Sequence, residues 1–144
     1  MAKPDDALTA FNNGFTRSSA VFSAFADDLG LSGDLAKKIS CGFGAGVSLT
    51  GNTCGAVSGA ILAIGLKYGK SEAGDSAANE KTRALVRQFI DEFTEKNRSI
   101  NCTGLLRYDL SNQENFDKAR AENLFATRCP EYVRGAAAIL ERMI

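Results

Sequence analysis

The segment from Thr53 to Tyr68, which reads TCGAVSGAILAIGLKY, limits what this chain can fold into more than any other stretch. It is apolar over most of its length, yet it contains three glycines, each of which costs a helix about 1 kcal/mol relative to alanine. Gly55 and Gly59 lie four residues apart on one side of a helix, so close contact with another backbone can compensate for that cost. We therefore predict a buried central helix.

Helical patterns dominate the rest of the chain as well. Apolar residues recur at intervals of three and four, Ser32 can cap a short helix, and Pro130 suits the first turn of the last one. Helices are predicted over residues 4–12, 15–29, 33–40 and 53–68, in a long stretch ending near residue 97, over 116–125, and from 129 onward. No segment has the pattern of a strand. The predicted fold class is all-α, a compact helical bundle around the buried glycine-containing central helix, in a single all-helical domain over residues 1–144.

Charge and composition exclude several classes of function. The 17 basic residues balance 17 acidic ones, so no net field attracts nucleic acid, and we expect no nucleic-acid partner. The chain contains no histidine, which rules out a Cys-His or Ser-His nucleophile pair and a histidine-ligated zinc or haem. Any nucleophile or metal ligand must therefore come from Cys, Asp, Glu or hydroxyl side chains.

The cellular compartment is expected to be the cytoplasm. The N-terminal residues MAKPDDALTAF have no apolar core of a secretory signal. The longest apolar run, Cys54 to Leu66, is too short and too rich in glycine to span a bilayer, so no membrane segment is expected. Cysteines in a reducing compartment favour redox or metal roles over a structural disulfide framework.

A glycine-rich stretch precedes the central helix. Cys41 to Gly46 reads CGFGAG, and alternating glycines permit backbone conformations that other residues avoid. The stretch matches neither GxGxxG after a strand nor a P-loop, so nucleotide binding is not favoured. We predict a structured loop.

The four cysteines are the main candidates for chemistry. Thr53 is a plausible N-cap, which would put Cys54 at the first helical position, where free amides and the helix dipole stabilise a thiolate and lower the thiol pKa. Cys102 and Cys129 also fall at predicted helix starts, whereas Cys41 lies in the glycine-rich loop. Cys54 is therefore the strongest candidate for a reactive thiol.

These residues resemble a known family. Residues 54–59, CGAVSG, are similar to the CGAxxG signature of the C_GCAxxG_C_C family of redox-active proteins. Further similarity lies at Gly42–Gly46, Ile64–Gly69, Asn101–Cys102 and Cys129–Pro130. The resemblance covers nearly the whole chain, and it implies a cysteine-based redox role without a defined reaction or substrate.

One position departs from the family pattern. The resemblance places the family's first cysteine in the N-terminal helix, where this chain has Arg17, or at most Ser18. Cys54, Cys102 and Cys129 carry over, whereas Cys41 is a fourth thiol at a different place. Cys41 either replaces the missing cysteine from another direction or serves only in packing.

Two chemical functions follow for these thiols. In thiol-disulfide redox chemistry, Cys54 is the attacking thiolate and Cys102, Cys129 or Cys41 the resolving partner, so the predicted catalytic residues are Cys54, Cys102 and Cys129. In the alternative, the same three thiols and Cys41 hold a metal ion or iron-sulfur cluster, although their sequence spacing lacks the close pairs of ordinary zinc or ferredoxin motifs.

A third function needs no chemistry. The chain would then be a helical interaction module, as a monomer or a homo-oligomer, whose buried cysteines only pack. Across the three functions, the expected cofactor is unknown: none, or a cysteine-ligated metal or iron-sulfur cluster. The expected partner is an unidentified redox partner or a small molecule. The sequence does not decide whether the protein is an enzyme.

Overall fold

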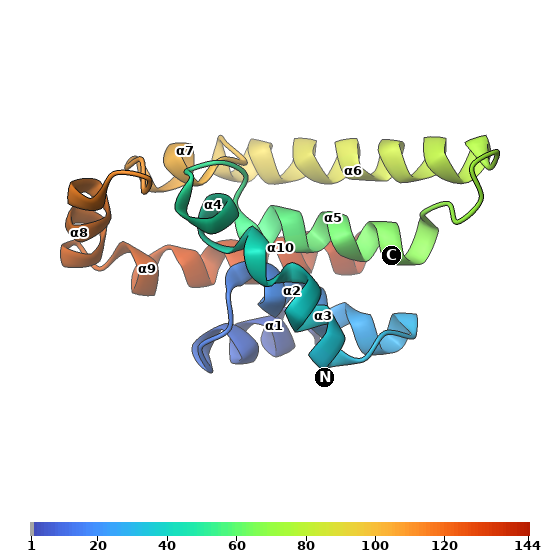
Figure 1. Cartoon of the computed structure of the whole chain (residues 1–144), viewed down its shortest axis with the longest axis horizontal. Helices are drawn as coiled ribbons and strands as arrows, with labels where there is room; N and C mark the ends of the chain where they lie inside the picture. Colours follow the sequence, from blue (N-terminus) through green and yellow to red (C-terminus); the bar gives the residue numbers. More distant parts are fainter. Residues whose placement is uncertain (1) are drawn as a thin grey trace.

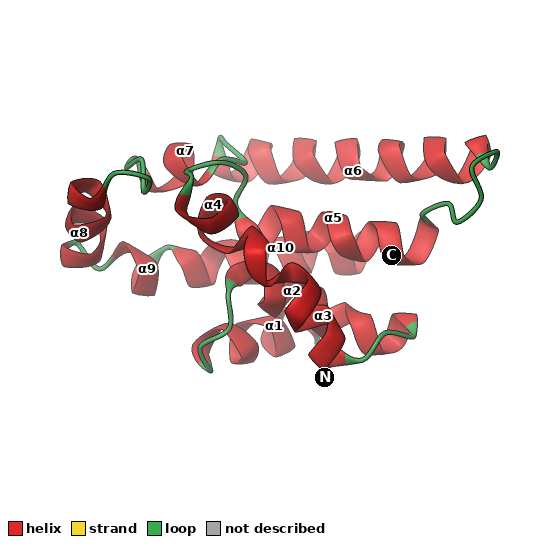
Figure 2. Ribbon diagram, in the orientation of Figure 1, coloured by secondary structure: helices red, strands yellow, loops and turns green. Residues whose placement is uncertain are grey.

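Helices form nearly all the regular structure of residues 2–144, the part of the chain that the computed structural model describes (Figure 1 and Figure 2). In chain order they are α1 (Lys3–Asn12), α2 (Arg17–Ala26), η1 (Asp27–Leu29), α3 (Gly33–Ser40), η2 (Cys41–Phe43), α4 (Gly44–Leu49), α5 (Gly55–Tyr68), α6 (Ser76–Asn97), α7 (Cys102–Leu106), α8 (Gln113–Ala121), α9 (Leu124–Thr127) and α10 (Cys129–Met143). The β-structure in this range is one isolated bridge, between Thr53 and Asn101. The prediction of an all-α fold is confirmed.

Side-chain caps set several helix boundaries. Ser32 accepts a hydrogen bond from the backbone N–H of Leu35 at 3.2 Å and so caps α3, as predicted. Thr16 caps α2 in the same way, so this helix begins two residues later than its apolar spacing indicates. The end of the predicted helix over 15–29 is a separate 3-10 turn, η1, before Gly30 at φ 88°.

The glycine-containing helix α5 lies between α6 on one side and α2 and α10 on the other (Figure 1). Its first half is buried, and its two N-terminal glycines lie against the backbone of α2. A Cβ atom at Gly55 would lie 2.9 Å from the amide nitrogen of Ser18, and one at Gly59 would lie 2.6 Å from the carbonyl oxygen of Ser18. The predicted close contact of two backbones is therefore confirmed, and its partner is the start of α2.

The predicted structured loop contains an unexpected conformation. Residues 45–49, within α4, all have positive φ, from 54° to 69°, and only one of the five is glycine. A left-handed conformation costs an L-residue about 1–2 kcal/mol, so contacts must hold this turn in place. The Ser48 hydroxyl donates to the carbonyl of Gly42 at 2.8 Å, and the amide of Asn52 donates to the carbonyl of Gly46 at 2.9 Å. The turn covers the start of α5.

Among the described helices, none combines the length and the apolarity that a bilayer-crossing helix needs.

Candidate functional site

Cys54 and Cys102 are brought together by the β-bridge. The amide of Cys54 donates to the carbonyl of Ile100 at 2.6 Å, and the amide of Cys102 donates to the carbonyl of Asn52 at 2.7 Å. In an antiparallel pairing, these positions are diagonal neighbours on one face, so both thiols point to the same side. Cys54 was predicted at the first helical position, but α5 begins one residue later, at Gly55, and Cys54 is the residue before it. Cys102 is the first residue of α7.

A backbone contact also fixes Cys102. A Cβ atom at Gly46 would lie 2.6 Å from the Cβ of Cys102, so only glycine fits at this point of the left-handed turn. Thr103, the next residue after Cys102, donates its hydroxyl to the carbonyl of Gly51 at 2.9 Å. The glycine-rich loop is therefore one wall of the thiol cluster.

Arg17 places a positive charge among the thiols. Its Nη1 donates to the Sγ of Cys129 at 2.9 Å, and its Nη2 donates to the Sγ of Cys102 at 4.0 Å. The side chain is only 5% exposed, although it carries a guanidinium. Close packing of Gly55 against the start of α2 is what lets the arginine reach this depth, because the Cβ of Arg17 lies beside that glycine.

Three of the four predicted site residues converge. Cys54, Cys102 and Cys129 are each at most 1% exposed, and all three influence the pKa of Arg17. All four cysteines of the chain are free thiols. Cys41 is exposed and lines a separate depression with Lys37 and Lys38, so the structure does not bring it to the other three.

Burial controls the protonation of the cluster. Burial raises the pKa of Cys54, and the opposing influences of Arg17 and of the N–H groups that begin α5 do not offset it. Burial likewise raises the pKa of Cys102, and it raises the pKa of Cys129 to about 11 despite the nearby Arg17. The expectation that a helix start lowers the pKa of Cys54 is therefore wrong, because complete desolvation outweighs the helix amides.

The pKa of Arg17 is raised above its ordinary value, so the guanidinium keeps its proton more firmly. Burial is the largest single influence and lowers it, but the sulfur groups of Cys129, Cys54 and Cys102 together more than reverse this effect and leave the pKa raised. Arg17 is therefore a permanent positive charge in the interior.

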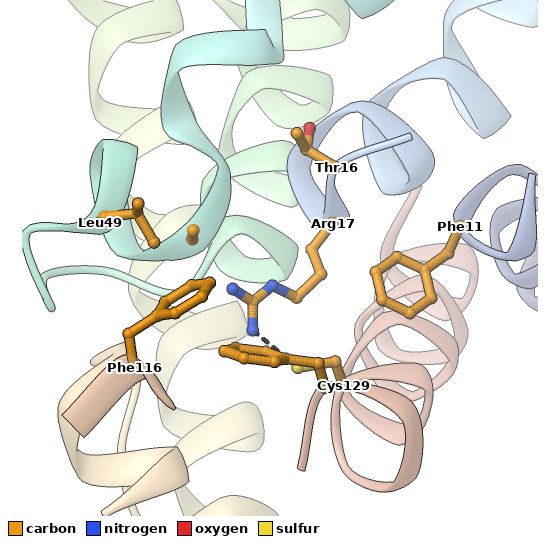
Figure 3. A pocket seen from close by; sticks show the side chains of 8 residues that line it. Phe11, Thr16, Arg17, Leu49, Phe116 and Cys129 are labelled. Carbon is orange, nitrogen blue, oxygen red and sulfur yellow. Dashed lines mark hydrogen bonds between the residues drawn. The ribbon is translucent and has the colours of Figure 1, made fainter. Parts of the chain in front are cut away.

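A cavity of about 240 Å³ leads to this charge. It is lined by Phe11, Thr16, Arg17, Ala45, Leu49, Phe116, Phe125 and Cys129. Figure 3 shows the Arg17 side chain extending between Phe11 and Phe116 toward Cys129. Cys129 is thus the thiol of the cluster that lines the cavity, whereas Cys54 and Cys102 do not line it.

The predicted metal site does not fit this arrangement. Over residues 2–144, no group of three or more Cys, Asp or Glu side chains is placed to hold a metal ion. The Arg17 guanidinium lies among the sulfur atoms, and its charge repels a metal cation.

Sequence reasoning did not assign a role to Arg17 or to the aromatic residues of the cavity. The available signal was that Arg17 is the only charged residue in the segment 17–26, RSSAVFSAFA, which is otherwise small or apolar around the whole helix. Such a helix is buried on most sides, so its single charge has to point into a site. No sequence signal brings Phe11 and Phe116 to one cavity.

Comparison with known proteins gives one match. Residues 15–143 match the family model described as "Putative redox-active protein (C_GCAxxG_C_C)". Neither the curated proteins nor the solved structures contain a match.

Proposed function

Because this chain belongs to the C_GCAxxG_C_C family, we propose that it carries out thiol-disulfide redox chemistry with Cys129, Cys102 and Cys54. The observation that supports this proposal most strongly is the convergence of three free thiols on one buried guanidinium, with one thiol facing a cavity. A nearby cation favours the thiolate, which is the reactive form of cysteine.

Accessibility favours Cys129 as the attacking thiol. It lines the cavity and accepts the 2.9 Å hydrogen bond from Arg17, whereas Cys54, the residue favoured by the sequence, is completely buried and does not line the cavity. Cys102 is the better resolving thiol, because it packs in the same hydrophobic cluster as Cys129 and near the same guanidinium. Cys54 packs in the neighbouring cluster and is the second choice.

The reaction consumes a disulfide as oxidant. The Cys129 thiolate attacks one sulfur of the substrate disulfide, forms a mixed disulfide, and releases the other sulfur as a thiolate that takes up a proton. Cys102 loses its proton and attacks the sulfur of Cys129, which forms the Cys102–Cys129 bond and releases the second substrate thiol. The substrate gains two electrons and the protein loses two. The step breaks the hydrogen bond of 2.9 Å from Arg17 to the Sγ of Cys129.

Thiol counting and disulfide mapping test this proposal. The reduced chain is treated with glutathione disulfide without oxygen, its remaining thiols are counted, and its peptides are mapped by mass spectrometry. We expect the loss of two thiols and a Cys102–Cys129 disulfide within one chain. Cys129→Ser should abolish this disulfide, whereas the matched control Cys41→Ser should keep it. Unreactive Cys54, Cys102 and Cys129 in the folded protein, whether or not the exposed Cys41 is modified, would overturn the proposal.

A non-catalytic helical module is the second candidate. The observation in its favour is the near-complete burial of Cys54, Cys102 and Cys129, which is typical of inert structural cysteines. Treatment with glutathione disulfide distinguishes this candidate from the redox function, because the three buried thiols of a non-catalytic module would react only when the chain unfolds.

A further inference from the structure

Within residues 2–144, no carboxylate side chain forms an ion pair with Arg17. The ion pairs recorded for residues 2–144 involve other residues, and the two hydrogen bonds recorded for Arg17 in that range both go to sulfur, although a guanidinium has five N–H groups. A charge buried without a partner is strongly unfavourable. Because burial raises the pKa of each neighbouring thiol, the cluster supplies little negative charge near neutral pH.

The cavity in front of Arg17 is otherwise apolar. Five of its eight lining residues have hydrocarbon side chains, namely Phe11, Ala45, Leu49, Phe116 and Phe125. The rings of Phe116 and Phe125 lie 5.3 Å apart between centroids and form one aromatic wall. Thr16, the remaining polar residue beside Arg17 and Cys129, uses its hydroxyl to cap α2. The cavity therefore has a charged end and an apolar body.

The dimensions and the charge restrict the ligand. Sites for drug-sized molecules occupy roughly 300–1,000 Å³, so a cavity of about 240 Å³ takes a smaller molecule. A carboxylate matches a guanidinium because it can accept two parallel hydrogen bonds. A doubly charged anion such as phosphate fits less well, since a single cation would have to balance both charges in an apolar lining.

We propose that this cavity binds a small monocarboxylate with an aromatic or branched aliphatic body, its carboxylate on Arg17 and its body against Phe116 and Phe125. Binding needs the arginine and the apolar walls but no reactive thiol. The proposal therefore stands or falls separately from the redox function.

Calorimetric titration of the reduced full-length chain tests the proposal, with benzoate and 4-methylpentanoate as probes. Their neutral analogues benzamide and 4-methylpentanamide, together with inorganic phosphate, are the comparisons. We expect each carboxylate to bind at least about tenfold more tightly than its amide, since hydrogen bonds to charged groups are the stronger ones. Equal affinity for acid and amide, or no heat of binding from either carboxylate, would overturn the proposal.

Variants locate the binding. Arg17→Met keeps an unbranched side chain but removes the guanidinium, and it should abolish benzoate binding. The matched control Arg120→Met removes an arginine that lies over the Phe116 ring without lining the cavity, and it should preserve binding. Benzoate binding retained in folded Arg17→Met would contradict the proposal.

A measurement on the unmodified protein tests the proposal without relying on variants that have to fold. Benzoate should shift the side-chain Nε–Hε NMR signal of Arg17, and benzamide should not. Binding of benzoate without any change in that signal would place the ligand elsewhere and contradict the proposal.

Discussion

At the residue scale, Arg17 decides how the cluster behaves. It is a buried cation whose neighbours are three thiols, and burial and charge act on those thiols in opposite directions. Burial wins at each sulfur, so the thiols are held protonated near neutral pH while the guanidinium stays charged. The reactivity of Cys129 therefore depends on how much of the burial effect Arg17 cancels.

Removal of Arg17 should slow the alkylation of Cys129. Because Arg17 lowers the pKa of Cys129 against burial, Arg17→Met should raise that pKa above about 11 and reduce the thiolate present at a given pH. The measurement is the rate of Cys129 modification by iodoacetamide between pH 8 and pH 10, read by mass spectrometry. Arg120→Met is the control and should alkylate like the unmodified protein. A faster rate in Arg17→Met would contradict this account.

The raised pKa of Cys129 should also make stability depend on pH. The folded state keeps the proton up to a pKa of about 11, against an ordinary value of 9.0, so its contribution to stability is complete below pH 9 and is lost as the pH rises to 11. The loss amounts to about 2–3 kcal/mol. Urea unfolding at pH 8 and pH 10.5 measures it. Between pH 8 and pH 10.5, Cys129→Ala should lose less stability than the unmodified protein. Equal losses would contradict the raised pKa of Cys129.

At the element scale, the contact between α5 and α2 sets the depth of Arg17. A methyl group at Gly59 would meet the carbonyl oxygen of Ser18, a backbone atom that cannot turn away. Gly59→Ala should therefore lower the free energy of unfolding by about 1–3 kcal/mol. Gly65→Ala is the matched control on the same helix, since its added methyl meets no atom within 4 Å, and it should raise the free energy of unfolding by up to about 1 kcal/mol.

Chemical denaturation of the two variants checks this contrast. The same sign of change in both variants would mean that the start of α2 does not rest on Gly59.

The helices themselves could be predicted from local signals. Apolar spacing predicted a long helix ending near residue 97, where α6 ends at Asn97, and Ser32 marked the start of α3 correctly. The left-handed turn in α4 could not be predicted, because Ala45 and Val47 disfavour positive φ locally. Contacts distant in sequence hold it, including the packing of Gly46 against Cys102.

The candidate site could be predicted only in part. Helix starts identified three of its thiols, but nothing local indicated that Cys41 would stay apart or that burial would outweigh the helix dipole at Cys54. The position of Arg17 beside Cys129 joins residues 112 apart in sequence, which only the packed fold determines.

At the scale of the whole molecule, the site lies where two hydrophobic clusters meet. Cys54 belongs to the larger cluster, and Cys102 and Cys129 belong to the smaller one. Phe11 and Tyr132 pack against both clusters. We therefore expect one cooperative unfolding transition, with the same midpoint by far-ultraviolet circular dichroism and by exposure of the buried thiols. Two separated transitions would contradict the single domain over residues 1–144.

The central claim is that a guanidinium, and not a metal ion, lies at the centre of the thiol cluster. The family resemblance predicts a cysteine at Arg17, or at most at Ser18, and the Nη atoms of Arg17 lie beside Cys129 and Cys102. Replacement of this arginine by cysteine should remove the repulsive charge and add a fourth thiol, the number of ligands in an all-cysteine structural zinc site.

The most direct test is the zinc content of the unmodified chain and of Arg17→Cys, each reduced, incubated with zinc without oxygen, and freed of excess metal. The account predicts about one zinc per chain in Arg17→Cys, lost again in Arg17→Cys combined with Cys102→Ser, and far less than one in the unmodified protein. One zinc bound per unmodified chain through Cys54, Cys102 and Cys129 would contradict it.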